Sequence, residues 1–459
     1  MKIGLITLGC DKNTVDSERY LAQLVGHGAE LAESLEEADV ILVNTCGFID
    51  AAKQESIDAL IEAGRMKIEG ACQAVVAVGC MVERHKNELL AELPEVDLFL
   101  GSSEMRQLVP ALEARGLVGG EVVDHPGVRI YAGNLPHVRY LKISEGCDHG
   151  CAFCAIPLMR GRHRSFSLEE IVREAQLLEA QGARELNLVA QDLAHYGRDR
   201  RDGVRLPELL QSLLAETSIP WLRMLYLYSA GLTPRLLEVM AREPRLVPYL
   251  DIPIQHASDT VLARMRRPER ARTIREKVSR VREVVPDVAI RTTCIVGFPG
   301  ETPDDFARLV DFLEDVRFER VGAFTYSAQE GTRAAELEDD VPEEVKLERL
   351  ERLTELQRSI TAERYERHIG RTVRAIVDRA GEGRTLWQAD DVDGITHLIG
   401  DAPSGTMVDV RLDEVVDDYD FRATVVRAHD VPRPATARST KRNRKLPVMI
   451  GISDGSFGR

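Results

Sequence analysis

Apolar runs of strand length alternate with helical stretches along most of the chain, and this alternation restricts the fold more than any other feature of the sequence. The first three runs are KIGLITLG, VILVNT and AVVAVG, and helices are predicted between them at about 15–25 and 50–66. Strands that alternate with helices are typical of a parallel sheet covered by helices. The sequence therefore predicts a Rossmann-like parallel α/β domain, which we place at residues 1–125.

A cysteine follows each of these three runs: Cys10, Cys46 and Cys80. Because the carboxyl ends of parallel strands lie at one edge of a sheet, the three thiols are expected to meet there. A single cysteine at a strand end is commonly just a small buried apolar residue. Three at equivalent positions favour a shared ligand. Cys72 precedes its run and is expected at the opposite edge.

Six further runs with helices between them follow a connector at residues 118–136: VRYLKIS, ELNLVAQ, LRMLYLY, YLDIPIQ, VAIRTTCIVG and VGAFTYS. Six parallel units are too few for an eight-stranded barrel, so we predict an open, partial (β/α)6 TIM-type barrel at residues 136–366. The active end of such a barrel is formed by the carboxyl ends of its strands. A helical pattern that begins at Pro342 is predicted to close the barrel or to lead into the next domain.

The segment GCDHGCAFC follows the first of these six runs and places Cys147, Cys151 and Cys154 in one loop. A zinc ion would need a fourth ligand, and although His149 and His163 lie nearby, zinc ligands usually form two separated pairs. A 4Fe-4S cluster normally takes four cysteines, so three would leave one iron open to a small molecule. We favour the iron–sulfur cluster.

The Cys-x3-Cys-x2-Cys spacing, with Phe153 before the last cysteine, resembles the radical S-adenosyl-L-methionine (AdoMet) superfamily. The segments TLGCDKNTVDSE, VNTCGFID and VGCM are similar to the N-terminal domain of the methylthiotransferases, a branch of that superfamily. VGFPGET, which contains Gly297 and Gly300, resembles the glycine-rich segment that contacts AdoMet.

The resemblance implies two 4Fe-4S clusters and S-adenosyl-L-methionine as cofactors. It assigns the catalytic cluster to Cys147, Cys151 and Cys154, with Phe153, Gly297 and Gly300 as AdoMet-binding residues. It assigns the second cluster to Cys10, Cys46 and Cys80. In this family hydrogen abstraction starts at the first cluster, sulfur comes from the second, and a second AdoMet supplies the methyl group.

Polar residues end two of the six barrel runs: Gln191 and Asp192 the second, Gln255 and His256 the fourth. They are expected either to face the AdoMet or substrate cavity or to cap loops, because strand-end residues of barrels serve both purposes.

Two other sets of residues are interpreted as structural. Asn13, Asp16 and Ser17 begin the helix that follows Cys10 and are predicted to cap it. Cys294 lies inside an apolar run and is predicted to be a core residue.

Short alternating runs with turns at GEG, DVDG and PSG predict a small antiparallel β-barrel at residues 370–430. Its position and pattern resemble the OB-like TRAM domain that ends methylthiotransferases. Residues 371–430 contain 13 Asp and Glu against 7 Arg and no Lys, a net charge of −6. The remaining residues, 431–459, begin with a basic, weakly apolar stretch and are predicted to be a disordered tail.

Composition and charge exclude several classes of protein. A net charge of −15 argues against a nucleic-acid surface along the whole chain. No run is long enough to span a membrane, no signal peptide is recognised, and eight cysteines in 459 residues are too few for a disulfide scaffold. We expect a cytoplasmic protein.

Four segments, VNTCGFID, ISEGC, MRGRHRS and YLDIPIQHAS, resemble in sequence the ribosomal-protein branch of the methylthiotransferases. The resemblance implies a radical AdoMet transferase that β-methylthiolates an aspartate of small-subunit ribosomal protein twelve. Its partners would be that protein, an electron donor and a sulfur donor, with no membrane, and the enzyme is expected to be a monomer. The alternatives are a transfer RNA methylthiotransferase acting on N6-isopentenyladenosine and, from another class, a non-catalytic iron–sulfur electron carrier.

Overall fold

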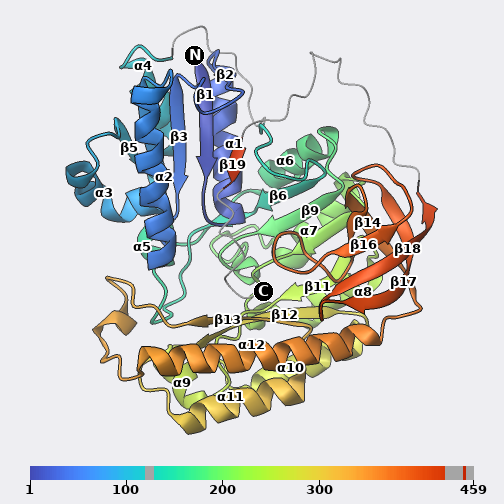
Figure 1. Ribbon diagram of the computed structural model, residues 1–459. Coiled ribbons are helices and arrows are strands. Elements are labelled where there is room, and N and C mark those ends of the chain that lie inside the picture. Colours follow the sequence, from blue (N-terminus) through green and yellow to red (C-terminus); the bar gives the residue numbers. More distant parts are fainter. Residues whose placement is uncertain (119–128, 430–447, 451–459) are drawn as a thin grey trace.

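The computed structural model describes residues 1–118, 129–429 and 448–450. Its first sheet is parallel and has the strand order β19-β1-β3-β4-β5, with β2 also paired to β1 (Figure 1). The elements of this part are β1 (Lys2–Thr7), α1 (Asp11–Gly26), β2 (Glu30–Leu31), β3 (Val40–Thr45), α2 (Asp50–Glu69), β4 (Ala74–Gly79), α3 (Cys80–Glu92), β5 (Leu98–Gly101), η1 (Ser102–Gln107) and α4 (Leu108–Glu113). The predicted parallel α/β domain is confirmed, and β5, a four-residue strand, extends it.

The strand β19 (Val448–Ile450) corrects one prediction. It pairs in parallel with β1, with Leu5 opposite Val448, although the whole tail was predicted to be disordered. The rest of that tail, and residues 119–128 of the predicted connector, lie outside the described residues.

The second sheet has the order β13-β12-β11-β10-β9-β6, and all its neighbouring strands are parallel. Its strands are β6 (Val138–Lys142), β9 (Glu185–Val189), β10 (Trp221–Met224), β11 (Leu246–Asp251), β12 (Ala289–Val296) and β13 (Arg320–Thr325). Its main helices are α6 (Leu168–Ala180), α7 (Leu206–Glu216), α8 (Pro234–Arg242), α10 (Ala271–Val284), α11 (Pro303–Val316) and α12 (Glu343–Glu366). The predicted open, partial barrel is confirmed.

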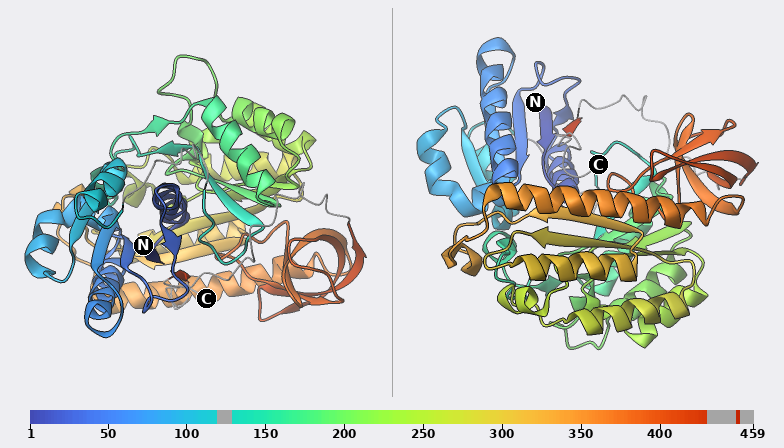
Figure 2. Two further views of the ribbon diagram at one scale, coloured as in Figure 1. Left: turned by 90° about the horizontal axis from the view of Figure 1, so that it is seen from above. Right: turned by 60° about the horizontal axis from the view of Figure 1, so that its bottom comes forward.

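Shorter elements connect these strands and helices. They are β7 (Ser144–Glu145), α5 (Ile156–Arg160), β8 (Arg164–Ser165), η2 (Leu193–His195), η3 (Ser229–Gly231), α9 (Asp259–Arg264) and η4 (Arg333–Glu336). Apolar side chains of α6 to α8, α10 and α11 pack on the strands in one large core, which includes the fully buried Cys294, as expected. Pro342 is the N-cap of α12, which runs along β13 toward the C-terminal barrel (Figure 2). Among the described helices, none is long and apolar enough to cross a membrane.

The C-terminal barrel is closed, with the strand order β14-β15-β16-β18-β17. Its strands are β14 (Thr372–Arg379), β15 (Glu382–Thr385), β16 (Thr396–Ile399), β17 (Met407–Val416) and β18 (Asp420–Ala428). All neighbours are antiparallel except β16 and β18, which are parallel. The predicted small antiparallel barrel is therefore confirmed, with the parallel pair of β16 and β18 as its one exception.

The turn between β15 and β16 attaches the C-terminal barrel to the second sheet. Asp390 accepts hydrogen bonds from the Tyr140 hydroxyl on β6 at 2.6 Å and from the Asn187 amide on β9 at 2.7 Å. Asp393 accepts one from the Tyr249 hydroxyl on β11 at 2.7 Å. The acidic residues of this turn therefore serve the contact between the two parts of the molecule.

Glu185, the first residue of β9, lies fully buried between two arginines. Arg223 Nε is 2.7 Å from one of its carboxylate oxygens, and Arg384 of the C-terminal barrel is 2.8 Å from the other. Burial by itself raises the pKa of Glu185, but the two arginines outweigh burial and lower it. The carboxylate is therefore charged. Removing it leaves the buried Arg223 without a charged partner, whereas Arg384 keeps Asp378 at 2.7 Å.

Glu185→Ala is expected to lower the free energy of unfolding by about 3–5 kcal/mol, because an uncompensated buried charge is costly. Urea unfolding of the purified protein measures the change. The matched control is Glu276→Ala, which removes an exposed pair with Arg272 at 2.6 Å and should cost under about 0.5 kcal/mol. Equal losses in the two variants would show that the buried cluster does not hold the barrel in place.

Candidate functional site

Three of the four cysteines in the N-terminal part lie at the carboxyl edge of the first sheet. Cys46 directly follows β3, Cys80 follows β4 and begins α3, and Cys10 is the N-cap residue of α1. Burial, and after it the nearby Cys10 thiol, raises the pKa of Cys46 to about 12. Burial also raises the pKa of Cys80 to about 11, with Cys10 again contributing. The structure thus brings the three thiols into one neighbourhood.

Asn13 ties the three cysteine positions together. Its side-chain amide donates hydrogen bonds to the carbonyl oxygens of Leu8, at 2.7 Å, and Thr45, at 3.2 Å, just before two of the cysteines. Its Oδ1 lies 3.8 Å from Cys80 Sγ. Gly9 adds a steric requirement, because a Cβ at this position, where φ is +87°, would lie 2.9 Å from Cys46 Sγ.

The prediction that Asn13, Asp16 and Ser17 cap α1 is wrong. All three side chains are buried, and the N-cap residue is Cys10, which makes no side-chain capping bond. Ser17 binds β-strand residues: its hydroxyl accepts from Thr7 at 2.7 Å and from the Asn44 amide at 2.9 Å. These polar residues therefore face the sheet edge and the second part of the molecule rather than the helix terminus.

A second set of three cysteines, Cys147, Cys151 and Cys154, lies in the loop between β7 and α5. The backbone fixes this loop through Cys147 N donating to Gly161 O at 3.1 Å and Ala152 N donating to Met265 O at 2.9 Å. Burial raises the pKa of Cys147 to about 11 and that of Cys154 to about 12. Both thiols are therefore protonated at neutral pH, and a bound metal would have to displace the protons.

The number of thiols in each triplet bears on the kind of metal. Each triplet consists of three free cysteines. A structural zinc ion would need a fourth ligand, whereas three thiolates on a 4Fe-4S cluster leave one iron without a protein ligand. The donor set therefore fits such a cluster. Among the described residues, His149, Asp192 and His195 form a separate group whose ligand atoms lie within 4.8 Å of one another.

The two cysteine sets approach each other through α5, which begins two residues after Cys154. Cys80 packs in a buried cluster with Ala155, Met159 and Ile156. Ser102, which follows β5, donates from its hydroxyl to Met159 O at 2.6 Å. The edge of the first sheet therefore sits directly against the segment that leaves the cysteine loop.

The segment predicted to contact AdoMet lies beside the loop. Phe153 packs in the same apolar cluster as Phe298, the residue after Gly297. Glu301 accepts hydrogen bonds from the backbone N–H groups of Gly297, at 2.6 Å, and Phe298, at 3.2 Å. Gly297 and Gly300 both have positive φ, at +71° and +76°, so the turn itself requires glycine. Their contact with AdoMet stays a prediction.

The four polar residues predicted at strand ends make different contacts. Gln191 donates to Glu145 Oε1 at 3.0 Å, on the cysteine-loop side of the barrel. Asp192 caps η2 by accepting from Ala194 N at 2.8 Å, and its other oxygen is 2.8 Å from His149 Nε2. Gln255 has a positive φ of 70° and forms a bridge to β12.

His256 is fully buried, and its Nδ1 accepts from Ser258 N at 2.8 Å. Burial lowers the pKa of His256 to about 3, so this ring is neutral. It stabilises the turn in which it lies.

Several contacts near the cysteines could not be predicted from the sequence. The His149 ring stacks on Tyr228 at 4.3 Å, and Arg267 lies over the same tyrosine at 3.9 Å while its NH1 is 3.7 Å from Cys151 Sγ. Arg160 Nε is 3.1 Å from Cys80 Sγ. Each contact joins positions far apart in the sequence, and no local motif marks it.

Two family models match the chain. The model described as Radical SAM superfamily matches residues 141–313, and the uncharacterized protein family UPF0004 matches residues 2–101. The chain is 45% identical to the ribosomal protein uS12 methylthiotransferase RimO of Anaeromyxobacter sp. (strain Fw109-5), covering 98% of this chain and 99% of that protein. It is 43% identical to the protein of the same name from Moorella thermoacetica, covering 92% and 98%.

Among solved structures, the chain is similar to the radical S-adenosylmethionine methyltransferase TsrM from Kitasatospora setae. The structure of TsrM with tryptophan and an AdoMet analogue matches with a TM-score of 0.52 and 14% identity, covering 70% of this chain and 72% of that one. The structure with cobalamin and a [4Fe-4S] cluster matches with a TM-score of 0.50 and 14% identity. At this identity the likeness concerns the fold.

Proposed function

Because this chain belongs to the family of the ribosomal protein uS12 methylthiotransferases, we propose that it replaces a C–H bond at the β-carbon of an aspartate in uS12 by C–S–CH3. It is a radical AdoMet enzyme of the transferase class. The observation that carries the proposal is the meeting of two free cysteine triplets, from two different sheets, on either side of α5. An electron carrier would need neither the partial barrel nor the second triplet.

Each triplet has an assigned role in this proposal. Cys147, Cys151 and Cys154 hold a 4Fe-4S cluster whose open iron takes AdoMet, next to Phe153, Gly297 and Gly300. Cys10, Cys46 and Cys80 hold the second cluster. Once bound, the first cluster with AdoMet would supply one-electron chemistry for removing a hydrogen atom, and the second cluster and a second AdoMet would supply the sulfur and the methyl group.

The chain's own residues position these groups. Asn13 fixes the backbone at Cys10 and Cys46, and Met265 O and Gly161 O hold the cysteine loop. We assign the second-cluster domain to residues 1–125, the AdoMet domain to 136–366 and the TRAM domain to 370–430. The sulfur donor, a low-potential electron donor and uS12 are the partners that this chemistry requires.

Anaerobically reconstituted protein is expected to bind about eight irons, from two clusters of four. Replacing Cys147, Cys151 and Cys154 together by Ala should leave about half of that iron, because the second triplet lies on the other sheet. Iron and sulfide assays measure both values. Full iron content in the triple variant would rule out the assignment of that loop.

The proposed activity is tested directly on uS12. Reduced enzyme with AdoMet and a sulfur source should add about 46 Da, the mass of one sulfur, one carbon and two hydrogens, to one aspartate of uS12. Fragment-ion mass spectra locate the modified residue, and a reaction without AdoMet is the control. An unshifted uS12 in a reaction that cleaves AdoMet would contradict the proposed substrate.

A further inference from the structure

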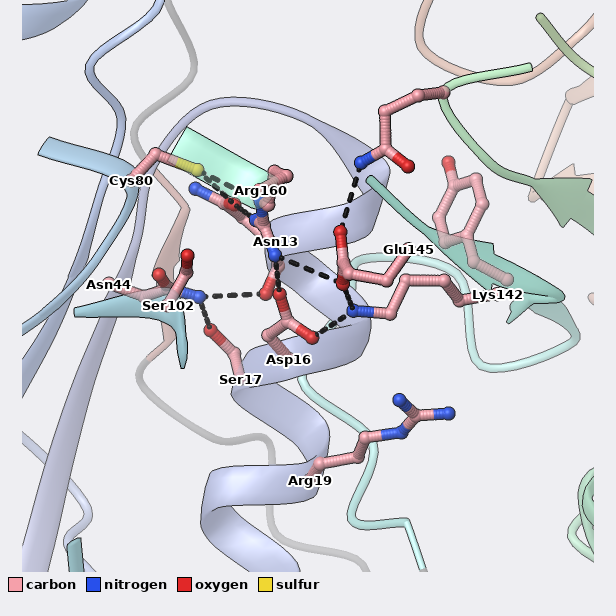
Figure 3. Close-up of polar contacts among 12 residues, drawn as sticks. Asn13, Asp16, Ser17, Arg19, Asn44, Cys80, Ser102, Lys142, Glu145 and Arg160 are labelled. Carbon is pink, nitrogen blue, oxygen red and sulfur yellow. Dashed lines mark hydrogen bonds and ion pairs between the residues drawn. The ribbon is translucent and has the colours of Figure 1, made fainter. Parts of the chain in front are cut away.

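Arg160, the last residue of α5, connects a cysteine of the first sheet to several polar groups. Its side chain is only 4% exposed. The Nε lies 3.1 Å from Cys80 Sγ, and NH2 donates to Asn13 Oδ1 at 2.5 Å. NH1 lies 2.6 Å from Asp16 Oδ2 and 3.4 Å from Glu145 Oε2 (Figure 3). One guanidinium group thus contacts a sulfur, an amide oxygen and two carboxylates.

The charges around Arg160 balance without the sulfur. Lys142 also contacts Asp16, and it lies 2.6 Å from Glu145, so two cations face two carboxylates (Figure 3). Burial opposes ionisation of Asp16, but Lys142 and Arg160 hold the pKa of this carboxyl well below its usual range. A thiolate at Cys80 would add a further negative charge, with the Arg160 Nε–H directed at it.

Only arginine fits this place among the cationic side chains. Its planar group offers five N–H donors in a fixed geometry, whereas a lysine ammonium offers three from a single point. Arg162, two residues further along, is exposed and provides a comparison from the same segment.

The contacts of Arg160 also span the cysteine loop. Glu145 lies two residues before Cys147, Arg160 six residues after Cys154, and the two are in contact. The other oxygen of Glu145 accepts from Gln191, two residues after β9. Both ends of the loop are therefore linked, through one side chain, to Asp16 on α1 and to Cys80.

We propose that Arg160 is a positioning residue that donates a hydrogen bond to the Cys80 sulfur of the second cluster, raises the reduction potential of that cluster and fixes its place against the loop. This inference rests on the proposed second cluster. Hydrogen bonds to cluster sulfurs and nearby charge are established determinants of cluster potential. Partners of metal ligands also affect metal retention, commonly 10- to 100-fold.

The experiment uses the full chain with Cys147, Cys151 and Cys154 replaced by Ala, so that the second cluster is observed alone. Redox titration followed by electron paramagnetic resonance compares this parent with its Arg160→Gln, Arg160→Lys and Arg162→Gln derivatives, together with iron per chain. Arg160→Gln should lower the reduced-to-oxidised ratio about tenfold at the parent's midpoint, a shift of 59 mV for one electron. Arg160→Lys keeps the positive charge but lacks the Nε–H, so its reduction potential should lie between those of the parent and of Arg160→Gln. Arg162→Gln should have the same potential as the parent.

Each outcome decides a separate point. A parent without iron refutes the second cluster and the role of Arg160 together. A parent with about four irons and an Arg160→Gln derivative of unchanged potential overturns the role of Arg160 alone. If Arg160→Gln retains no iron, the Arg160→Lys derivative decides, because a potential equal to the parent's would show that the Nε–H has no effect.

Discussion

Cys151→Ala is expected to abolish both AdoMet cleavage and sulfur insertion, whereas Cys46→Ala abolishes sulfur insertion and leaves AdoMet cleavage in place. The reason is the separation of the two triplets: Cys151 belongs to the loop at the carboxyl end of the second sheet, and Cys46 follows β3 of the first. Radical generation needs only the cluster of the loop.

The measurement is chromatography of 5′-deoxyadenosine and mass spectrometry of the product from the same reduced reaction. Cys72→Ala is the matched control, because Cys72 lies at the opposite end of β4 and donates to Ala74 O at 3.3 Å. It should retain both activities. Normal methylthiolation by Cys46→Ala would show that the second triplet has no role in sulfur delivery.

The enzyme is expected to modify uS12 and to leave transfer RNA unmodified. Transfer RNA is a polyanion whose binding domains use Lys and Arg to displace counterions. The C-terminal barrel region, residues 371–430, has a net charge of −6 and no lysine. A basic partner such as a ribosomal protein would be attracted to an acidic barrel, and salt should slow that encounter.

The structure changes the size of this electrostatic effect. Asp378, Asp390 and Asp393 are turned inward with Arg384, which leaves 9 acidic and 6 basic residues for the surface among the described positions 371–429, a net charge of −3. The sign persists. Product formation with uS12 should therefore fall as salt rises from about 0.05 to 0.5 M, over which the Debye length shortens severalfold. A rate that is independent of salt would show that the acidic side chains keep the barrel hydrated but do not attract uS12.

Much of the fold could be predicted because its strands are continuous apolar runs. Parallel strands buried on both faces are recognisable from sequence, as in VILVNT and AVVAVG, whose residues are all buried. The position of Cys46 and Cys80 at one sheet edge follows from that topology. β5 was missed because LFLG is too short to stand out, and the parallel β16–β18 pair because registers in a small barrel depend on closure rather than on local pattern.

The polar surroundings of the cysteines could not be predicted. Asn13, Asp16 and Ser17 have the composition of a helix N-terminus, but their partners lie on other elements, as in the ion pair of Asp16 with Lys142. Arg160 and Cys80 are eighty positions apart, and their contact exists only because α5 packs on α3. Local propensity describes a residue's own segment, whereas these side chains are placed by packing between segments.

The most direct test is one anaerobic reaction that contains reduced enzyme, AdoMet, a sulfur source, uS12 and transfer RNA bearing N6-isopentenyladenosine. Mass spectra of both macromolecules are recorded from the same tube. We expect about 46 Da added to one aspartate of uS12 and an unchanged nucleoside profile of the transfer RNA. A methylthiolated adenosine together with an unshifted uS12 would contradict the proposed function.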